Sequence, residues 1–168
     1  MRKPALSDSI QDYLKEIYKL AEESEGRVTV TALAKRLAVS PPSVSGMVKK
    51  LAALDLVAHE RSRGMTLTPA GERVALEVIR HHRLLELYLA ETLGIGIDDV
   101  HDEADRLEHA LSEELEARID ESLGFPTHDP HGDPIPSVDL QIDEGHAHAL
   151  ESLEAGATGR FVRVSDSD

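Results

Sequence analysis

Six side chains that commonly bind metal ions gather in two short stretches of the sequence. His82 and Glu86 lie four residues apart, which is about one helical turn. Four more follow at helical spacing: His101, Asp105, Glu108 and His109. Imidazole nitrogens and carboxylate oxygens are ligands of divalent first-row metals. Two facing helices that carry these side chains could therefore hold one or two cations.

The alternative is an ordinary charged helix surface, because acidic residues are common in this region and 9 histidines are spread through the chain. Four histidines lie in polar, irregular sequence and are interpreted as such surface residues: His128, His131, His146 and His148. In the two stretches, the shared helical face favours a metal site. The absence of cysteine excludes disulfides, a thiolate nucleophile, iron–sulfur clusters and Cys-type zinc sites.

The charge of the chain is distributed unevenly. A net charge of −14 by itself argues against nucleic acid as a partner. However, residues 1–65 hold 11 Lys and Arg against 8 Asp and Glu, whereas residues 66–168 hold 7 against 24. Within residues 27–65 the balance is 7 basic to 2 acidic residues. One contiguous segment could therefore face the phosphates of a nucleic acid.

That basic segment has the pattern of a winged helix-turn-helix. Helices are expected over residues 8–25, 30–39 and 41–54, followed by strands over residues 56–60 and 65–68. Ser40 is a suitable N-cap, and the two prolines after it fit the first turn of a helix. Gly64 can supply the positive φ that a hairpin turn needs.

A winged helix-turn-helix places the N-terminal part of its second helix in the major groove. Hydroxyl groups near that helix end and lysines further along could contact phosphates or base edges. The candidate DNA-binding residues are Ser40, Pro42, Ser43, Ser45, Lys49, Lys50, Arg61 and Arg63. Capping and a solvated surface would explain these residues singly, and some winged helices bind only proteins. The ordered combination favours double-stranded DNA.

The second half is also predicted to be helical, so the fold class is mainly α. One helix is expected from Pro69 to before Gly94, and another from Asp98 or Asp99 to before Gly124. Several leucines exceed what one packed helix pair needs: Leu85, Leu89, Leu107, Leu111 and Leu115. They predict a homodimer, with core packing as the rival explanation.

The C-terminal part changes in composition. Residues 125–138 contain four prolines and are expected to form a linker or a wrapping arm. Residues 160–164 alternate apolar and basic side chains, which predicts a strand. A lone strand needs partners, so either the chain is expected to stop within a small β domain or the strand docks elsewhere.

No apolar run approaches the roughly 20 residues that cross a bilayer, and the N-terminus lacks the pattern of a signal peptide. The expected location is therefore the cytoplasm, with no membrane partner.

The sequence resembles the diphtheria-toxin-repressor family of metal-dependent transcriptional regulators, which includes the manganese transport regulators. The resemblance covers about residues 8–138 and is carried by IQDYLKEIY, RHHRLLE, VHDEADRLEH and DPIP. It implies a winged helix-turn-helix DNA-binding domain over residues 1–68 and a helical metal-binding and dimerisation domain over residues 69–138. Residues 139–168 would be a linker and the opening of the SH3-like β domain of longer members.

The resemblance also implies metal ligands. Asp12 would join Asp105, Glu108 and His109 in a primary site. The ligands of a neighbouring ancillary site would be His82, Glu86 and His101. In manganese regulators, the position of His82 belongs to the main cluster.

Departures from the family pattern point to the metal. Iron-type members have sulfur ligands at the positions of Asp12 and Asp105, which are carboxylates here. Oxygen and imidazole ligands favour Mn²⁺, with Fe²⁺, Co²⁺, Zn²⁺ or Cd²⁺ as alternatives. Lys15 stands where two-metal manganese regulators have a glutamate, which argues against their binuclear arrangement. Gly46 stands where some relatives have a base-reading amide, so the operator sequence stays open.

The predicted function is a metal-dependent transcriptional regulator, with repression of metal-uptake genes as the family expectation. The alternatives are a metal-independent winged-helix regulator, an interaction module, or a metal-dependent hydrolase. No HExxH spacing supports the hydrolase, so no enzymatic activity is expected.

Overall fold

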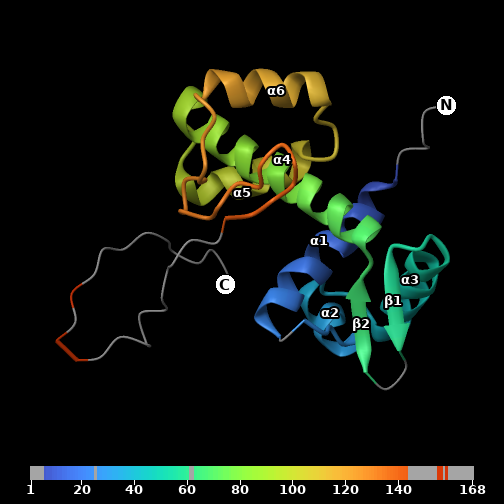
Figure 1. The fold of residues 1–168 in the computed structure, drawn as a ribbon. Coiled ribbons are helices and arrows are strands. Elements are labelled where there is room, and N and C mark those ends of the chain that lie inside the picture. The colour runs from blue at the N-terminus through green and yellow to red at the C-terminus, as the bar shows by residue number, and fades with distance from the viewer. Residues whose placement is uncertain (1–5, 25, 61–62, 144–154, 157, 159–168) are drawn as a thin grey trace. The chain divides into compact units, whose positions relative to one another are not determined.

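The computed structural model describes residues 6–24, 26–60, 63–143, 155–156 and 158. The chain forms two compact units, Met1–Val78 and Ile79–Asp168, and each is described by itself. The elements are α1 to α3, the strands β1 and β2, and α4 to α6 in chain order (Figure 1). The predicted strand at 160–164 lies outside the described residues.

The first unit begins with three helices, as predicted. They are α1 (Asp8–Glu23), α2 (Val30–Arg36) and α3 (Pro41–Ala53). The side chain of Thr29 caps α2 by accepting a hydrogen bond from the amide of Ala32. Ala38 takes a left-handed φ of 53°, which ends α2 earlier than the sequence pattern suggested.

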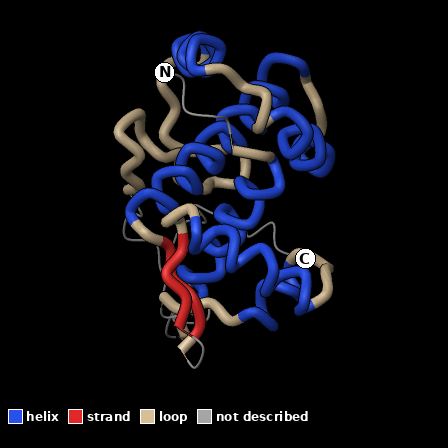
Figure 2. The backbone as a smooth tube through the Cα atoms, turned by 90° about the vertical axis from the view of Figure 1, so that its right-hand side faces the viewer, coloured by secondary structure: helices blue, strands red, loops and turns tan. Residues whose placement is uncertain are grey.

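The predicted hairpin is confirmed and has an additional partner. β1 (Val57–Glu60) pairs with β2 (Gly64–Leu67) in antiparallel register (Figure 2). Val28 pairs with Met65 as an isolated antiparallel bridge on β2. A Cβ added to Gly64, whose φ is +86°, would lie 2.6 Å from the Val28 carbonyl oxygen. Glycine is therefore required where the hairpin meets this bridge.

A single apolar core holds these elements together. Its fully buried side chains come from all three helices and from β2: Leu14, Ile17, Leu33, Val44, Val48, Leu51 and Met65. Each such side chain contributes roughly 1.5–3 kcal/mol through burial. One face of α3 is thus fixed in the core, and the opposite face, with Lys49 and Lys50, is exposed.

The start of α4 (Pro69–Leu93) is fixed against the beginning of the hairpin. The hydroxyl of Thr68 accepts the amide of Gly71 and donates to the carbonyl of Asp55, at 3.1 and 2.7 Å. The amide of Thr68 donates to the carbonyl of Leu56 at 3.0 Å. A Cβ added to Gly71 would lie only 2.0 Å from that same carbonyl oxygen.

We expect Gly71→Ala to destabilise the protein by roughly 1–3 kcal/mol, the usual cost of overpacking, because the backbone must move to make room for the methyl group. Gly46→Ala is the matched control, since a Cβ there meets nothing within 4 Å. It should stabilise α3 by about 0.5–1 kcal/mol. Urea unfolding midpoints would measure both effects, and a Gly71→Ala protein as stable as the wild type would contradict the close packing.

The second unit contains most of α4 together with α5 (Ile97–Leu107) and α6 (Glu113–Ser122). The prediction of one continuous helix from Asp98 or Asp99 is therefore wrong. Gly96 is the N-cap of α5, and the two aspartates lie in its first turn. The hydroxyl of Ser112 accepts the amide of Leu115, so a new helix begins there.

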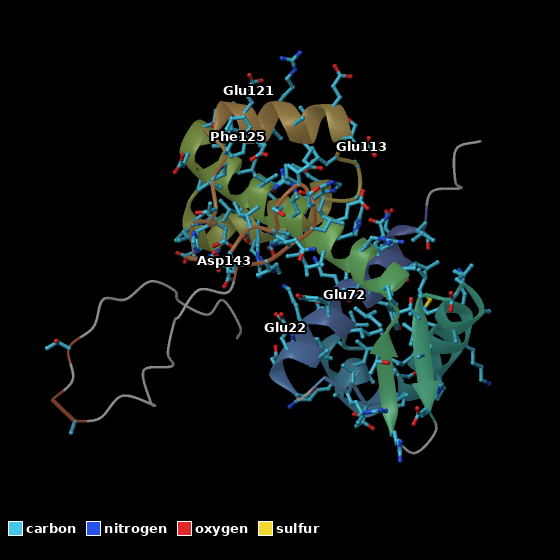
Figure 3. The ribbon with its side chains drawn as sticks, in the orientation of Figure 1. Glu22, Glu72, Glu113, Glu121, Phe125 and Asp143 are labelled. Carbon is cyan, nitrogen blue, oxygen red and sulfur yellow. The ribbon has the colours of Figure 1, made fainter. Side chains whose placement is uncertain are left out.

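Acidic residues follow this second start and favour it, because they complement the positive end of the helix dipole. Glu121 lies on the outer side of α6 and Glu113 at its N-terminal end, and both are exposed (Figure 3). Ile119 faces the other way and is buried with Leu84, Leu85 and Ala104.

The leucines assigned to a dimer surface divide into two groups. Leu85 and Leu89 are only 4% and 5% exposed, so core packing explains them and their dimer role is wrong. Leu107 and Leu115 are 42% and 52% exposed. Leu111 is partly buried against the core. The surplus apolar surface is thus smaller than the sequence pattern suggested.

The proline-rich residues 125–138 form a wrapping arm rather than a free linker. Ile135 is buried in the core of the second unit, and its amide donates to the carbonyl of Thr127 at 2.9 Å. Arg80 donates to the carbonyl of Pro136 at 2.7 Å, and Arg83 donates to that of Pro134. Among the described residues, no helix has the length and apolar character to span a membrane.

Candidate metal centre

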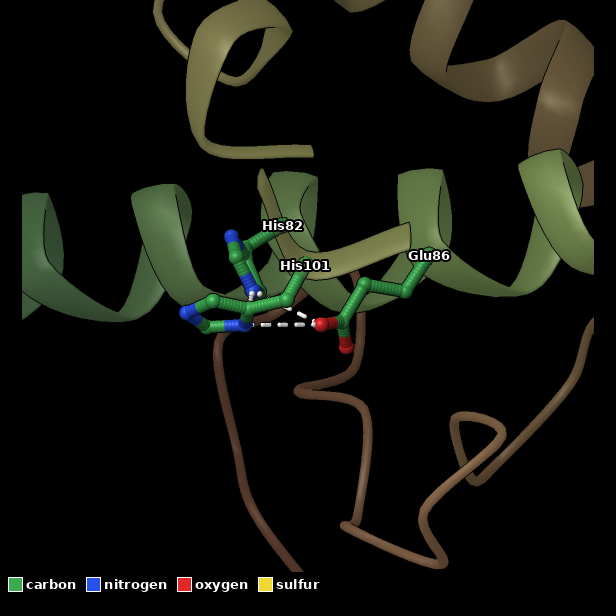
Figure 4. A group of neighbouring side chains, drawn as sticks. All are labelled: His82, Glu86 and His101. Carbon is green, nitrogen blue, oxygen red and sulfur yellow. Dashed lines mark hydrogen bonds and ion pairs between the residues drawn. The ribbon is translucent and has the colours of Figure 1, made fainter. Parts of the chain in front are cut away.

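His82 lies at the centre of the side chains that the sequence singled out. Its Nδ1 is 2.6 Å from Glu108 Oε2 and 3.2 Å from Asp105 Oδ1. Its Nε2 is 3.0 Å from Glu86 Oε1 and 3.1 Å from His101 Nδ1 (Figure 4). The two ring nitrogens of one histidine thus face two different sets of ligand atoms.

Helical spacing explains how these side chains meet. His82 and Glu86 are one turn apart on α4, and His101 and Asp105 are one turn apart on α5. Glu108 is the C-cap of α5. His109 follows it, with Nε2 at 3.4 Å from Glu108 Oε1. We call the six residues the His82 cluster: His82, Glu86, His101, Asp105, Glu108 and His109.

The cluster is buried on one side and accessible on the other. The side chains of Glu86 and Glu108 are at most 1% exposed, whereas those of His101 and Asp105 are 39% and 46% exposed. Two buried carboxylates are costly unless positive charge or hydrogen bonds compensate them. Here the compensation comes from His82 and His101. An ion could reach this site from solvent.

The spacing of the ligand atoms fits a bound cation. Two ligands bonded at about 2.1 Å and at right angles lie roughly 3 Å apart. Ligand atoms of His82, Glu86 and His101 lie within 4.8 Å of one another, as do those of His82, Asp105 and Glu108. These atoms are carboxylate oxygens and imidazole nitrogens, a ligand set suited to first-row divalent metals.

The same contacts shift the pKa values in the metal-free protein. Burial alone would lower the pKa of His82, but hydrogen bonds to Asp105, Glu108 and Glu86 outweigh it and raise the pKa to about 10. Burial alone would raise the pKa of Glu86, but hydrogen bonds from His101 and His82 lower it to about 2. Mainly through its hydrogen bond to Glu86, the pKa of His101 is also raised. In the metal-free protein, protonated histidines thus supply part of the positive charge that a bound cation would supply.

We expect metal binding near pH 7 to release at least about one proton, because metals bind neutral imidazole and the pKa values of His82 and His101 are both raised. Affinity should therefore rise with pH, by about tenfold per unit for each proton released. In the metal-free protein the sign is opposite: protonated His82 contributes stability below pH 6.5 that is lost as the pH rises to about 10. Calorimetric titrations in two buffers of different ionisation enthalpy would count the proton, and a count of zero would contradict the prediction.

Sequence reasoning missed two residues beside the cluster. His131 Nδ1 lies 3.6 Å from Glu86 Oε2, and ligand atoms of Glu86, Asp129 and His131 lie within 4.8 Å of one another. The side chain of His131 is 12% exposed, so it is not an ordinary surface residue. Burial raises the pKa of Asp129 to about 6.

The remaining histidines set aside as surface residues differ. His128 is exposed and hydrogen-bonds to Thr127, whereas His146 and His148 lie outside the described residues. Asp12 lies on α1 of the first unit, and its place in the site stays a prediction.

The candidate DNA-binding residues lie mostly on the exposed side of α3. Pro42, Lys49 and Lys50 are exposed there, and Ser45 is partly exposed. The hydroxyls of Ser40 and Ser43 are 2.8 Å apart, and the Ser40 hydroxyl also accepts the Ser43 amide.

At the hairpin, Arg63 has a side chain that is 69% exposed and lies 3.7 Å from Glu60. Arg61 lies outside the described residues. The hydroxyls of the two serines at the start of α3 thus bond to each other and cap the helix, whereas the basic side chains of α3 and of the described part of the hairpin face solvent.

Two family descriptions match the chain. Residues 5–65 match "Iron dependent repressor, N-terminal DNA binding domain". Residues 68–137 match "Iron dependent repressor, metal binding and dimerisation domain".

Known proteins are similar over most of the chain. The diphtheria toxin repressor of Corynebacterium efficiens is 41% identical over 141 residues, which are 83% of this chain and 60% of that protein. The iron-dependent repressor IdeR of Mycobacterium tuberculosis is 37% identical over 160 residues, 90% of this chain and 69% of that protein. The chain thus spans about three fifths of the length of the diphtheria toxin repressors it matches.

Solved structures are also similar. A manganese-dependent transcriptional repressor in complex with manganese has a TM-score of 0.88 and 48% identity, covering 95% of this chain and 73% of that chain. The structure of ScaR with bound Zn²⁺ has a TM-score of 0.78 and 36% identity, with coverages of 94% and 73%.

Proposed function

The chain belongs to the iron-dependent repressor family, and from this premise we propose that it is a DNA-binding transcriptional regulator controlled by Mn²⁺. The observation that carries the proposal is the His82 cluster, which gathers three carboxylates and three imidazoles without a sulfur ligand. Its side chains lie in the stretch that matches the metal-binding description of the family.

Mn²⁺ is preferred because of the ligand types. Carboxylate oxygens suit Mn²⁺, whereas thiolates and thioethers select softer ions. Relatives carry both metals in their names: some are called iron-dependent, and others are manganese-dependent repressors. Zn²⁺ and Cd²⁺ are named with structures of ScaR, so these ions are reasonable probes in solution.

We assign the ligands to two neighbouring positions. His82, Glu86 and His101 would hold an ion at one, with His131 near the other oxygen of Glu86 and Asp129 close to both residues. The other position would be formed by Asp105, Glu108 and His109, joined by Asp12. This last ligand is assigned from the sequence resemblance, because α1 carries the IQDYLKEIY stretch.

The basic residues exposed on α3 and at the hairpin are the proposed contacts with the phosphates of operator DNA. A dimer would present two such helices to half-sites one helical turn, or roughly 34 Å, apart. Leu107 and Leu115, both exposed, are candidates for the dimer surface. Because the proposed partner is operator DNA, we place the protein in the cytoplasm.

Coupling between metal and DNA follows from charge. Without a cation, the carboxylates of the second unit would repel Asp12 in the first. A bound cation supplies the positive charge that makes their approach favourable. If the DNA-competent arrangement binds the cation about 100-fold more tightly, the equilibrium shifts by about 2.7 kcal/mol.

A DNA-selection experiment with and without Mn²⁺ tests the proposal. We expect enrichment of a sequence with two symmetric half-sites only when Mn²⁺ is present. Equal enrichment without metal would identify a metal-independent regulator. No enrichment in either condition would favour a protein-interaction module. A separate assay of ester hydrolysis tests the remaining alternative, since turnover that depends on Mn²⁺ would favour a hydrolase.

A further inference from the structure

A buried polar network, built from residues outside the His82 cluster, lies beside that cluster. Arg80 is 4% exposed and donates to Glu116 and Asp120 of α6 and to the carbonyl of Pro136. His81 Nε2 lies 2.9 Å from the second oxygen of Glu116. The network joins α4, α6 and the wrapping arm within the second unit.

The network ends on a residue of the metal centre. His81 Nδ1 lies 3.0 Å from the main-chain carbonyl oxygen of Glu108. A carbonyl oxygen can only accept, so this ring nitrogen carries the hydrogen and donates it. Glu108 is the C-cap of α5, where the last carbonyls of a helix lack intrahelical partners.

Two consecutive histidines therefore hold the same residue. His82 contacts the carboxylate of Glu108 at 2.6 Å, and His81 holds its main chain. Glu108 begins the turn between α5 and α6, at residues 108–112, where regular helical hydrogen bonding stops. The amide of Glu108 still donates to the carbonyl of Ala104 at 2.9 Å, so the helix holds one side of the residue and His81 holds the carbonyl side.

We propose that His81 is a positioning residue of the metal centre, which fixes the main chain of Glu108 so that its carboxylate faces the ion. The inference rests on the proposed metal-binding function. It assigns His81 a role distinct from that of Arg80, whose three contacts attach α6 and the wrapping arm to α4 without touching Glu108. Partners that orient metal ligands typically contribute 10–100-fold to metal affinity.

Two nearly isosteric variants separate the contacts of His81. In His81→Asn, the amide nitrogen lies near the position of Nδ1 and keeps a donor for the Glu108 carbonyl. In His81→Gln, the longer side chain reaches toward Glu116 instead. Both keep a polar group in the buried network, so both are expected to fold.

Calorimetry with Mn²⁺ and the visible absorption of bound Co²⁺ would measure the site. We expect His81→Gln to lose 10–100-fold in affinity and to change the Co²⁺ spectrum, and His81→Asn to stay within about threefold of the wild type. The matched control is Asp120→Asn, which weakens the same network away from Glu108. It should lower the unfolding temperature of the metal-free protein and leave affinity unchanged.

The outcomes are distinguishable. If the wild type binds neither ion, the proposed function fails. If the wild type binds and His81→Gln binds equally well, the positioning role is wrong. Equal losses in His81→Gln and His81→Asn, or an equal loss in Asp120→Asn, would reduce His81 to a general stabilising residue and overturn the inference.

Discussion

Glu108→Gln should lower the affinity for Mn²⁺ at the position of Asp105, Glu108 and His109 by at least about 100-fold, or ~2.7 kcal/mol. The substitution keeps the size of the side chain but removes a negative charge from a side chain with no exposed surface. It replaces one of the two carboxylates beside the Nδ1 of His82 with a neutral amide, and breaking such buried charge pairs typically costs about 3–5 kcal/mol. DNA binding in the presence of Mn²⁺ should fall to the metal-free level.

The matched control for this variant is Glu103→Gln on the same helix. Glu103 forms its ion pair with Arg106 in a solvent-exposed position, away from His82. Exposed pairs of this kind contribute about 0–1 kcal/mol, so metal affinity should be unchanged. Calorimetry and a DNA-binding titration would measure both variants. Undiminished binding of Mn²⁺ at both proposed positions in Glu108→Gln would show that Glu108 is not a ligand.

Asp12→Ala should separate metal binding from DNA binding. We expect the position formed by His82, Glu86 and His101 to keep its ion, because all three side chains belong to the second unit. The stimulation of DNA binding by Mn²⁺ should fall from about 100-fold to nearly none, because the first unit then lacks its ligand. Fluorescence anisotropy of labelled operator DNA at increasing Mn²⁺ would measure this.

Asp8→Ala is the control, since it removes an exposed carboxylate one turn earlier on α1. It should respond to Mn²⁺ like the wild type. Circular dichroism and sedimentation would verify that both variants remain folded and keep their oligomeric state. Unchanged stimulation in Asp12→Ala would reject the bridging role of this residue and leave the rest of the metal centre intact.

Most of the fold could be predicted because its signals are local. Ser40 with two following prolines marks the start of α3, and Gly94 marks the end of α4, whatever the rest of the chain does. The break between α5 and α6 was missed because the apolar repeat continues through Leu111 and Leu115. The signal that could have found it was Ser112 followed by acidic residues, which is a helix start.

The part of the site that lies on helices could be predicted, because helical periodicity shows which side chains share a face. Spacing alone identified the ligand pairs on α4 and on α5, and the structure brings the pairs together around His82. Asp129 and His131 were missed because the wrapping arm has no repeating geometry from which the direction of a side chain could be predicted. His81 was missed because its role depends on a carbonyl group, which leaves no mark in the side-chain pattern.

The close approach of Gly71 to Leu56 leaves no space between the first turn of α4 and the start of the hairpin. We therefore expect these two elements to move as one rigid body. The hinge of a metal-dependent rotation would then lie elsewhere, and a turn of the start of α4 would displace Arg63 at the far end of the hairpin.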